Sequence, residues 1–340
     1  MVHLRIVVPS YQSEHALDLL DGTESVCNLV FLERAARRPV GDVILCDVAR
    51  QDASVVIADL RELDIDREGS ISIEEIDSQI SAAAAAAESA ARQGDRSDPV
   101  IWEELSARTS DSVALTPAFL IYMVLAMLIA AVGIYFDLPI LIVGAMVVGP
   151  EFGPIAGACV AIVNRQPGLV GRSLTALAIG FPLGIVVTLL ATLVLEAFGE
   201  IPREIDFDAH TLTRFIAEPN FFSVYVAVLA GVVGMLSLTT AKSSALVGVL
   251  ISVATIPAAA NMGVAAAYGD WSIFGSATAQ LAINLAAIFA AGLATLYVQR
   301  LDYIRRRRRH LSAGARARAG LPVGASRRAK SRTGSEPEAF

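Results

Sequence analysis

The spacing of apolar and polar residues changes along this chain. In the first 78 residues, short apolar runs with the length and alternation of strands lie at 3–9, 27–33, 42–48 and 70–73. Residues 11–21 and 51–63 instead place apolar side chains three and four positions apart, which is the spacing of an amphipathic helix. The predicted order of elements is therefore β-α-β-β-α-β.

Beyond residue 114 polar positions become rare, and six long apolar segments follow one another. A helix that crosses a membrane needs about 20 mostly apolar residues. The segments that meet this length are 115–136, 138–163, 173–198, 221–239, 243–268 and 273–299. The composition of the 340 residues, 54% hydrophobic and 18% charged, also excludes an ordinary soluble protein.

We therefore predict two fold classes in one chain: a membrane all-α bundle of six transmembrane helices, preceded by an α+β domain. The order β-α-β-β-α-β is that of the ferredoxin-like unit, in which two helices cover one face of a four-stranded antiparallel sheet. The predicted parts are a ferredoxin-like cytosolic domain at 1–78, a helical linker at 79–113, a transmembrane domain at 114–300 and a basic disordered C-terminal tail at 301–340.

The linker and the tail carry signals of their own. The linker includes Ile101, Trp102 and Leu105, a spacing that places these side chains either at the membrane surface or against the helix bundle. Residues 305–340 contain eleven Arg and Lys against two Glu, in a composition that cannot bury a core. We expect the arginines next to the last span to contact the anionic inner leaflet of the lipid bilayer, and we expect no nucleic acid as a partner.

The charges of the segments that connect the spans predict how the protein is oriented in the membrane. Arg165, Arg172, Lys242 and the five arginines from 305 fall on one side of the six spans, whereas residues 199–220, with five acids and two arginines, fall on the other. Since cytoplasmic loops hold the positive excess, both termini are expected in the cytoplasm. Residues 1–25 lack the apolar core of a signal peptide. The prediction is a multi-pass, homo-oligomeric protein of the cytoplasmic (inner) membrane.

Six spans divide into two groups of three, and an odd number in each group gives similar groups opposite orientations. The middle span of each group carries a Val-Gly pair near its start, ending at Gly144 or Gly248, and a proline about ten residues later, Pro154 or Pro257. Breaks in corresponding helices of an inverted 3+3 repeat indicate a transport site. The candidate transport-site residues are Gly149, Pro150, Glu151, Gly153, Pro154, Thr255, Pro257 and Asn261.

Glu151 is the first candidate, because a carboxylate at membrane depth costs about 2.5 to 3.5 kcal/mol and usually faces a cavity or a partner. In one interpretation it binds a cation or exchanges a proton, and in the other it caps the half-helix that follows. Gly149, Gly153 and Gly157 also have two interpretations, a cavity wall or close helix packing. Further polar side chains that line the same cavity or bond between helices are Gln280 and Asn284.

Residues 64–75, DIDREGSISIEE, fit the spacing of an EF-hand calcium loop, with Asp64, Asp66, Glu68 and Glu75 as ligands. The competing interpretation is a turn followed by the fourth strand, with Ile71 and Ile73 facing the core of the sheet. We favour the strand, because the fold needs its fourth strand and Glu68 is a longer ligand than the usual Asp or Asn.

Two motifs of the apolar part resemble the domain-of-unknown-function 389 family of prokaryotic membrane proteins. GAMVVGPEFGPIAG at 144–157 is similar to the family signature G-A-M-x-x-S-P-L-M-G-P-I-x-G, and LAGVVGMLSLTTAKSSALVGVLISVATIPAAANMG at 229–263 is similar to its A-x-G-x-x-G-A-L-S…S-x-x-L-x-G-V-x-I-A-V-x-L-x-P-P segment. The chain departs from the family at Gly149, Glu151 and Ala258, where Ser, Leu and a second Pro are usual. The resemblance implies a polytopic membrane protein and brings no activity.

These observations favour a membrane transporter or channel for an ion or small solute, with the N-terminal domain as a cytosolic regulatory domain. The alternative is a membrane-anchored sensor or scaffold without transport activity. An enzyme is disfavoured, because the spans contain no HExxH motif and no nucleophile paired with a base. We expect no catalytic residues, no cofactor and no metal.

Overall fold

The computed structural model describes residues 1–76, 78–92, 100–202, 221–240, 245–312 and 314–326. Backbone contacts divide the chain into two compact units. Unit 1 comprises Met1–Glu104 together with Gln299–Phe340, and unit 2 comprises Leu105–Val298.

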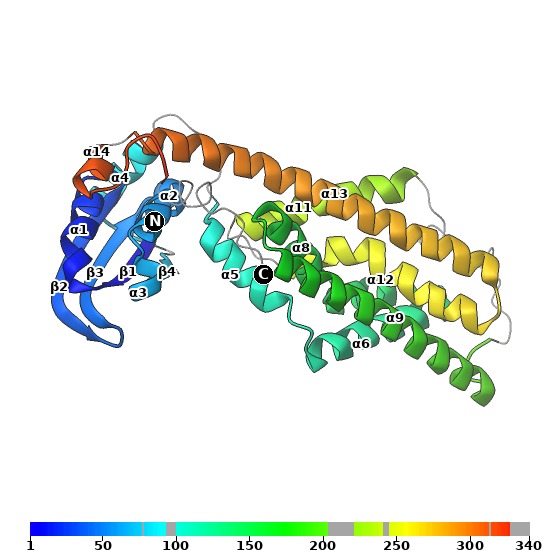
Figure 1. The fold of residues 1–340 in the computed structure, drawn as a ribbon. Coiled ribbons are helices and arrows are strands. Elements are labelled where there is room, and N and C mark those ends of the chain that lie inside the picture. The colour runs from blue at the N-terminus through cyan, green and yellow to red at the C-terminus, as the bar shows by residue number, and fades with distance from the viewer. Residues whose placement is uncertain (77, 93–99, 203–220, 241–244, 313, 327–340) are drawn as a thin grey trace, which may run out of the picture. The chain divides into compact units, whose positions relative to one another are not determined.

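Unit 1 is built around an antiparallel sheet of four strands in the order β2-β3-β1-β4 (Figure 1). The first 75 residues form β1 (Val2–Val8), the 3-10 turn η1 (Ser10–Gln12), α1 (Ser13–Asp21), β2 (Val26–Arg37), β3 (Val40–Val48), α2 (Arg50–Glu62), α3 (Ile65–Glu68) and β4 (Ser70–Glu75). The elements that follow in this unit are α4 (Ala82–Arg92), the start of α5 (Trp102–Ser112), the end of α13 (Trp271–His310) and α14 (Gly314–Arg318).

The core of unit 1 lies on one face of the sheet, because alternate residues of the central strands point to that face. In β1 these are Val2, Leu4, Ile6 and Val8, all fully buried. They share one core with the apolar side chains of β3 and with those of α1 and α2. The six predicted strands and helices of this region are thus confirmed.

The segment 64–75 forms a helical turn followed by the fourth strand. Ile65–Glu68 is one helical turn, and β4 pairs with β1 in a register that sets Ile71 opposite Ile6. Ile71 and Ile73 pack against the core, as the strand interpretation predicts. The carboxylates of the four acids bond to separate partners: Asp64 to Arg67, Asp66 to Arg61, Glu68 to Tyr11 and Glu75 to Arg50.

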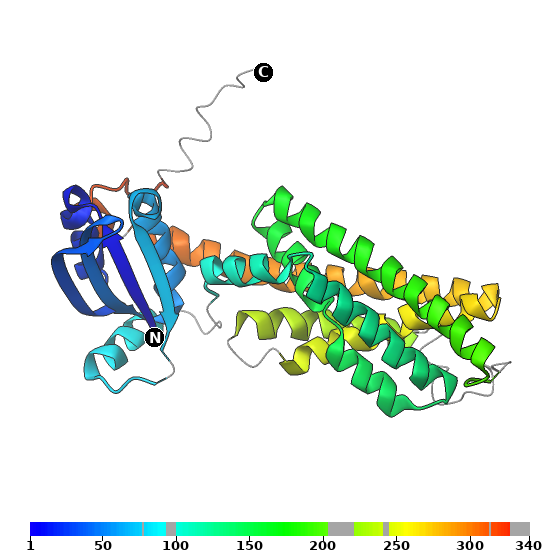
Figure 2. The ribbon, with the colours of Figure 1, turned by 90° about the horizontal axis from the view of Figure 1, so that it is seen from below.

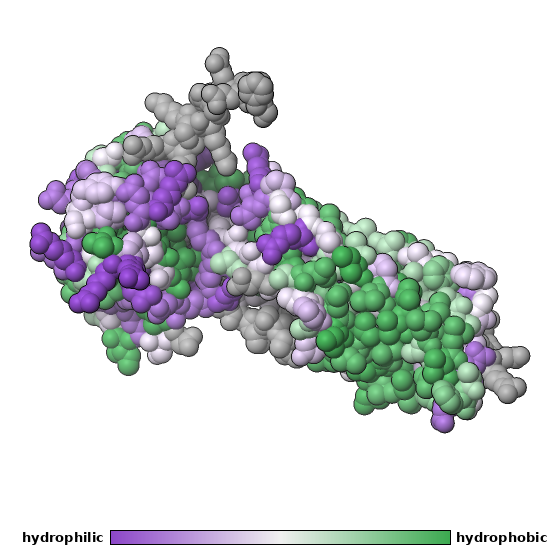
Figure 3. Space-filling model, turned by 60° about the horizontal axis from the view of Figure 1, so that its bottom comes forward, coloured by the Kyte–Doolittle hydropathy of each residue, from purple (hydrophilic) through white to green (hydrophobic). Residues whose placement is uncertain are grey.

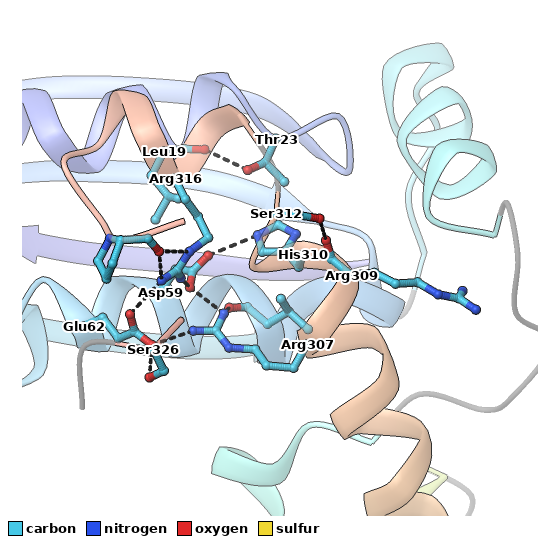
Figure 4. Close-up of polar contacts among 12 residues, drawn as sticks. Leu19, Thr23, Asp59, Glu62, Arg307, Arg309, His310, Ser312, Arg316 and Ser326 are labelled. Carbon is cyan, nitrogen blue, oxygen red and sulfur yellow. Dashed lines mark hydrogen bonds and ion pairs between the residues drawn. The ribbon is translucent and has the colours of Figure 1, made fainter. Parts of the chain in front are cut away.

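Residues 299–326 complete unit 1 through a buried ionic cluster (Figure 4). Asp59 and Glu62 of α2 are buried, and so is Arg316 of α14. Arg316 pairs with both acids, its Nη2 lying 2.8 Å from Glu62 Oε2. Arg307 of α13 also pairs with both acids, and its Nη2 lies 2.9 Å from Glu62 Oε1. His310 Nε2 lies 3.1 Å from Asp59 Oδ2.

The C-terminal part therefore differs from the disordered tail predicted from residue 301. Residues up to His310 continue α13, α14 follows, and Ala319 and Leu321 belong to the core of unit 1. The prediction failed because the composition of a segment does not show which residues it pairs with, and here these partners lie about 250 positions earlier in the sequence. Residues 327–340 lie outside the described part of the chain.

Ile101 and Trp102 of the linker are buried inside unit 1, and Leu105 is buried as well. Ile101 belongs to the core of the unit, and the ring of Trp102 packs edge-on against Tyr303, with Arg300 Cζ 4.8 Å from the ring centroid. A guanidinium over an indole ring adds a cation–π attraction to the packing.

Unit 2 consists of helices that run side by side in both ribbon views (Figures 1 and 2). They are α6 (Pro117–Tyr135), α7 (Pro139–Val148), α8 (Phe152–Val163), α9 (Pro167–Phe198), α11 (Phe221–Thr239), α12 (Ala245–Ala267) and α13 up to Val298. Large apolar side chains such as Ile140, Val147 and Leu190 are exposed, and Figure 3 shows a broad hydrophobic face over these helices. Such a surface matches the lipid interior of a bilayer.

Four described helices are long and apolar enough to cross a membrane, namely α6, α9, α11 and α13. The pair α7 and α8 makes a fifth if it is one span bent by 50°. Each of these coincides with one of the predicted spans. The predicted fifth span corresponds to α12, a helix of 23 residues whose first part falls among side chains that the structure leaves undescribed.

A hydrogen-bonded carboxylate stabilises the β2–β3 end of unit 1. Ser13 Oγ donates to Asp42 Oδ2 at 2.6 Å, and the backbone N–H of Arg34 donates to Oδ1 at 2.7 Å. The Ser13 hydroxyl, followed by the Arg34 N–H, holds the pKa of Asp42 below its ordinary value, although burial acts in the opposite direction. A lowered folded-state pKa contributes stability above the unfolded pKa, and this contribution is lost as the pH falls through the folded-state pKa.

We predict that Ser13→Ala destabilises unit 1 at pH 7 by about 1.5 to 3 kcal/mol, the usual contribution of a hydrogen bond to a charged group. The difference from the wild type should shrink below about pH 4, where Asp42 is protonated in the unfolded chain. The measurement is urea unfolding of the full chain at several pH values, followed by Trp102 fluorescence in a Trp271→Phe background. Ser89→Ala, at an exposed position of α4, is the control, and an equal loss at every pH would contradict the prediction.

We also predict that Arg316→Leu costs unit 1 about 3 to 5 kcal/mol, because it removes a buried guanidinium that neutralises Asp59 and Glu62 and leaves both buried acids to Arg307. The same fluorescence assay measures the loss. Arg308→Leu, at an exposed arginine in the last turn of α13, should change the unfolding free energy by less than about 0.5 kcal/mol. Equal effects of the two substitutions would show that the cluster contributes nothing.

Candidate functional site

The break between α7 and α8 is the feature that forms the candidate site. Gly149 ends α7, and its N–H donates to the carbonyl of Ala145 at 3.2 Å. Pro150 has no N–H to continue that helix. Glu151 is the N-cap residue of α8, and its carbonyl accepts the first helical hydrogen bond from Ile155 at 3.2 Å. The predicted break at GPEFGP is therefore a bend of 50° between two helices.

Glu151 is fully buried at this bend. Its Oε1 accepts a hydrogen bond from Thr255 Oγ1 of α12 at 2.8 Å, and Thr255 is fully buried as well. The Glu151 side chain makes no capping hydrogen bond to the described backbone of α8, so the capping interpretation is not what the structure shows. The carboxylate instead joins the broken span to α12.

α12 continues through Pro257 without a break, which differs from the predicted interruption of the second middle span. Proline inside a helix still leaves the carbonyl four residues earlier without its helical donor. Asn261 lies one turn beyond Pro257 and about 9 Å of helix rise beyond Thr255. Asn261 is 3% exposed, and its Oδ1 has no hydrogen-bond partner within the described part of the chain.

The small residues of α8 let this helix pack closely. A Cβ on Gly153 would lie 2.8 Å from the Ser112 carbonyl oxygen, and one on Gly157 would lie 2.1 Å from Val113 Cγ2. These two glycines therefore match the close-packing interpretation. Pro154 is buried in the first turn of α8. Of the predicted site residues, the structure brings Glu151 and Thr255 into direct contact.

Other polar side chains of unit 2 bond between helices. Tyr135 Oη and Thr192 Oγ1 lie 2.6 Å apart and link α6 to α9, while Ser223 Oγ donates to Gln280 Oε1 at 3.4 Å and links α11 to α13. Asn284 is buried in α13. Gln280 thus matches the interpretation of a bond between helices.

The chemistry available at the bend is that of oxygen atoms. A carboxylate and a hydroxyl bind a cation or exchange a proton, whereas no group of three or more His, Cys, Asp and Glu lies together among the described residues. Two features of the sequence pointed to this pair. Glu151 stands between two prolines, Pro150 and Pro154, and Thr255 stands two residues before another proline, Pro257. The cluster at Asp59 was missed, although two acids in the apolar helix spacing of α2 were a signal for it.

Long apolar helices with exposed apolar surfaces and a hydrogen-bonded carboxylate inside define a membrane-spanning protein. Residues 146–290 match the family described as Domain of unknown function (DUF389). The resemblance in the two motifs is thus confirmed over this part of the chain.

A curated relative, the "Uncharacterized protein MJ0678" of Methanocaldococcus jannaschii, is 28% identical over 191 residues. These residues are 56% of this chain and 56% of the relative, so the match spans just over half of either protein. No solved structure matches this chain. Neither the family description nor the name of the relative assigns a function.

Proposed function

We propose that this protein passes an ion or small solute across the cytoplasmic membrane, and that its N-terminal domain regulates the passage. The observation that supports this most is the Glu151 carboxylate, fully buried at a helix break among membrane-spanning helices and hydrogen-bonded to Thr255. An ionisable side chain inside a membrane domain is costly and usually marks an ion or proton pathway. The proposal assigns no catalytic step and no cofactor.

The mechanism places Glu151 as the cation or proton ligand and Thr255 as the residue that positions it. A cation would exchange its hydration shell for oxygen atoms of the carboxylate and the hydroxyl, whereas a proton would be carried by the carboxylate itself. The bend brings unpaired backbone ends of two helices to the same place, as discontinuous helices of transporters do. Pro257 weakens α12 one turn before Asn261, which extends the polar path along that helix.

Six membrane crossings agree with the composition of unit 1. Its core combines residues that precede the first apolar helix with residues that follow the last one, as Ile101 and Leu321 do. Both flanking parts must then lie on one side of the membrane, which requires an even number of crossings. The spans α6, α7 with α8, α9, α11, α12 and α13 give six, and the basic residues of the connecting segments favour the cytoplasm for both termini.

The finer fold assignments belong to the same proposal. The order β2-β3-β1-β4, with helices after β1 and β3, supports a ferredoxin-like domain. The inverted 3+3 repeat rests on the corresponding prolines of the two middle spans, of which the first is broken and the second continuous. We further propose that the protein assembles as a homo-oligomer.

The test of transport is flux through proteoliposomes that contain the purified full chain, with Na⁺, K⁺, H⁺ and Cl⁻ as probes. We expect selective flux of one probe, and a change of at least tenfold in Glu151→Gln, because the amide can neither carry the proton nor neutralise a cation. Glu200→Gln, an exposed acid after α9, is the matched control and should behave like the wild type.

Flux that Glu151→Gln leaves unchanged across pH 5 to 8 would remove this residue from the mechanism. No flux of any probe, from protein shown to be folded by its Trp102 fluorescence, would contradict transport of these ions. That result would favour the second candidate function, a membrane-anchored sensor, which the polar pocket of unit 1 described below supports.

The topology makes a separate prediction for cysteine labelling in intact cells. A membrane-impermeant maleimide should label Glu200→Cys, whereas Ser89→Cys and Ser312→Cys should react only after permeabilisation. All three positions are exposed, so a lack of labelling reports the side of the membrane rather than burial. The wild-type chain measures the background from its three native cysteines. Labelling of Ser89→Cys and Ser312→Cys from opposite sides would contradict an even number of crossings.

A further inference from the structure

Unit 1 contains a cavity of about 320 Å³ that the proposed transport mechanism does not use. Its walls come from four segments far apart in the sequence: the loop between α1 and β2, the first turn of α2, the end of α4, and the segment from His310 to Arg318. The volume lies at the lower end of the range for small-molecule sites. The cavity therefore fits a ligand of a few heavy atoms.

The loop between α1 and β2 supplies a buried hydroxyl without a partner. Ser25 is 3% exposed and lines the cavity, yet its Oγ has no hydrogen-bond partner in the part of the chain that the structure describes. The neighbouring Thr23 differs, because its hydroxyl donates to the carbonyl of Leu19 at 2.7 Å (Figure 4). A buried hydroxyl without a partner is costly, and a ligand in the cavity would satisfy it.

The segment after α13 supplies a cation. Arg318 lines the cavity and forms no ion pair with any residue that the structure describes, in contrast to Arg307 and Arg316, which neutralise Asp59 and Glu62. Its guanidinium lies over Gly22, where an added Cβ would be 2.8 Å from Arg318 Nη2. The missing side chain of Gly22 thus makes room for Arg318 at the wall of the cavity. The exposed guanidinium of Arg318 and the Ser25 hydroxyl line the same cavity, and such a combination favours a carboxylate, which a guanidinium binds through two hydrogen bonds.

Two acids line the same cavity and add negative charge to it. Glu24 is exposed, and Asp52 lies 4.0 Å from Arg306, at the limit of an ion pair. Carboxylates that line the same cavity as the cation disfavour a phosphate with two negative charges, whereas they attract an ammonium group. The cavity therefore combines a subsite for an anion with a subsite for a cation.

From this juxtaposition we infer that the cavity binds a small zwitterion of the amino-acid class. Arg318 and Ser25 bind its carboxylate, and Glu24 and Asp52 bind its ammonium group. His310 lines the cavity and contacts Asp59, so an occupied cavity is coupled to the ionic cluster that holds the C-terminal segment in unit 1. That the ligand regulates passage through the membrane rests on the function proposed above, whereas its binding does not.

The experiment is isothermal titration calorimetry of the full chain in detergent micelles, with glycine, L-alanine, L-glutamate, L-lysine and L-leucine as probes. Acetate, inorganic phosphate and ethylammonium serve as probes that carry one kind of charge only. We expect at least one amino acid to bind with a Kd below 1 mM, on the order of −4 kcal/mol or better. Each single-charge probe should bind at least tenfold more weakly.

The variants Ser25→Ala and Arg318→Gln should each weaken the binding of that amino acid at least tenfold. Arg308→Gln, an exposed arginine outside the cavity, is the matched control and should leave the Kd unchanged. Asp52→Asn should weaken the binding of the amino acid, while any binding of acetate should stay unchanged. Trp102 fluorescence shows whether each variant keeps unit 1 folded.

Three results would overturn the inference: no binding of any of the five amino acids, acetate or phosphate binding as tight as that of the best amino acid, or binding unaffected by Ser25→Ala and Arg318→Gln. Because the titration does not involve flux, its failure is distinct from a failure of the proposed transport activity.

Discussion

Buried charge is the constraint on which both units depend. Taking a carboxylate out of water costs several kcal/mol unless oppositely charged or hydrogen-bonding groups surround it. In unit 1 this requirement brings Arg307 and Arg316 to Asp59 and Glu62, and in unit 2 it brings Thr255 to Glu151. In each case the acid is joined to a residue more than 100 positions away in the chain.

The ionic cluster of unit 1 has consequences for the whole chain. It makes the segment after α13 part of the unit that the N-terminal strands and helices form. The same segment supplies Arg318 and His310 to the cavity. Neutralising two buried acids and lining the cavity are therefore tasks of one stretch of about 20 residues.

Unit 2 combines an apolar exterior with polar contacts between its helices. The apolar surface suits the bilayer, and hydroxyl pairs such as Tyr135 with Thr192 join the helices inside. The bend between α7 and α8 lies at Glu151, the N-cap residue of α8. Glycines at 153 and 157 then allow the second half of this span to pack against residues 112 and 113. A helix break and close packing thus occur together in one span.

Local patterns in the sequence determined the strands and helices of the first 75 residues, most of the apolar spans, the break at GPEFGP and Glu151 as the buried acid. These features depend on neighbours within a few residues, whose spacing is visible in the chain itself. Only the tertiary structure decided that Thr255 donates to Glu151, that α12 passes Pro257 unbroken and that Arg307 and Arg316 belong to Asp59 and Glu62. Such pairings join residues 100 to 260 positions apart, and periodicity carries no information about contacts over that distance.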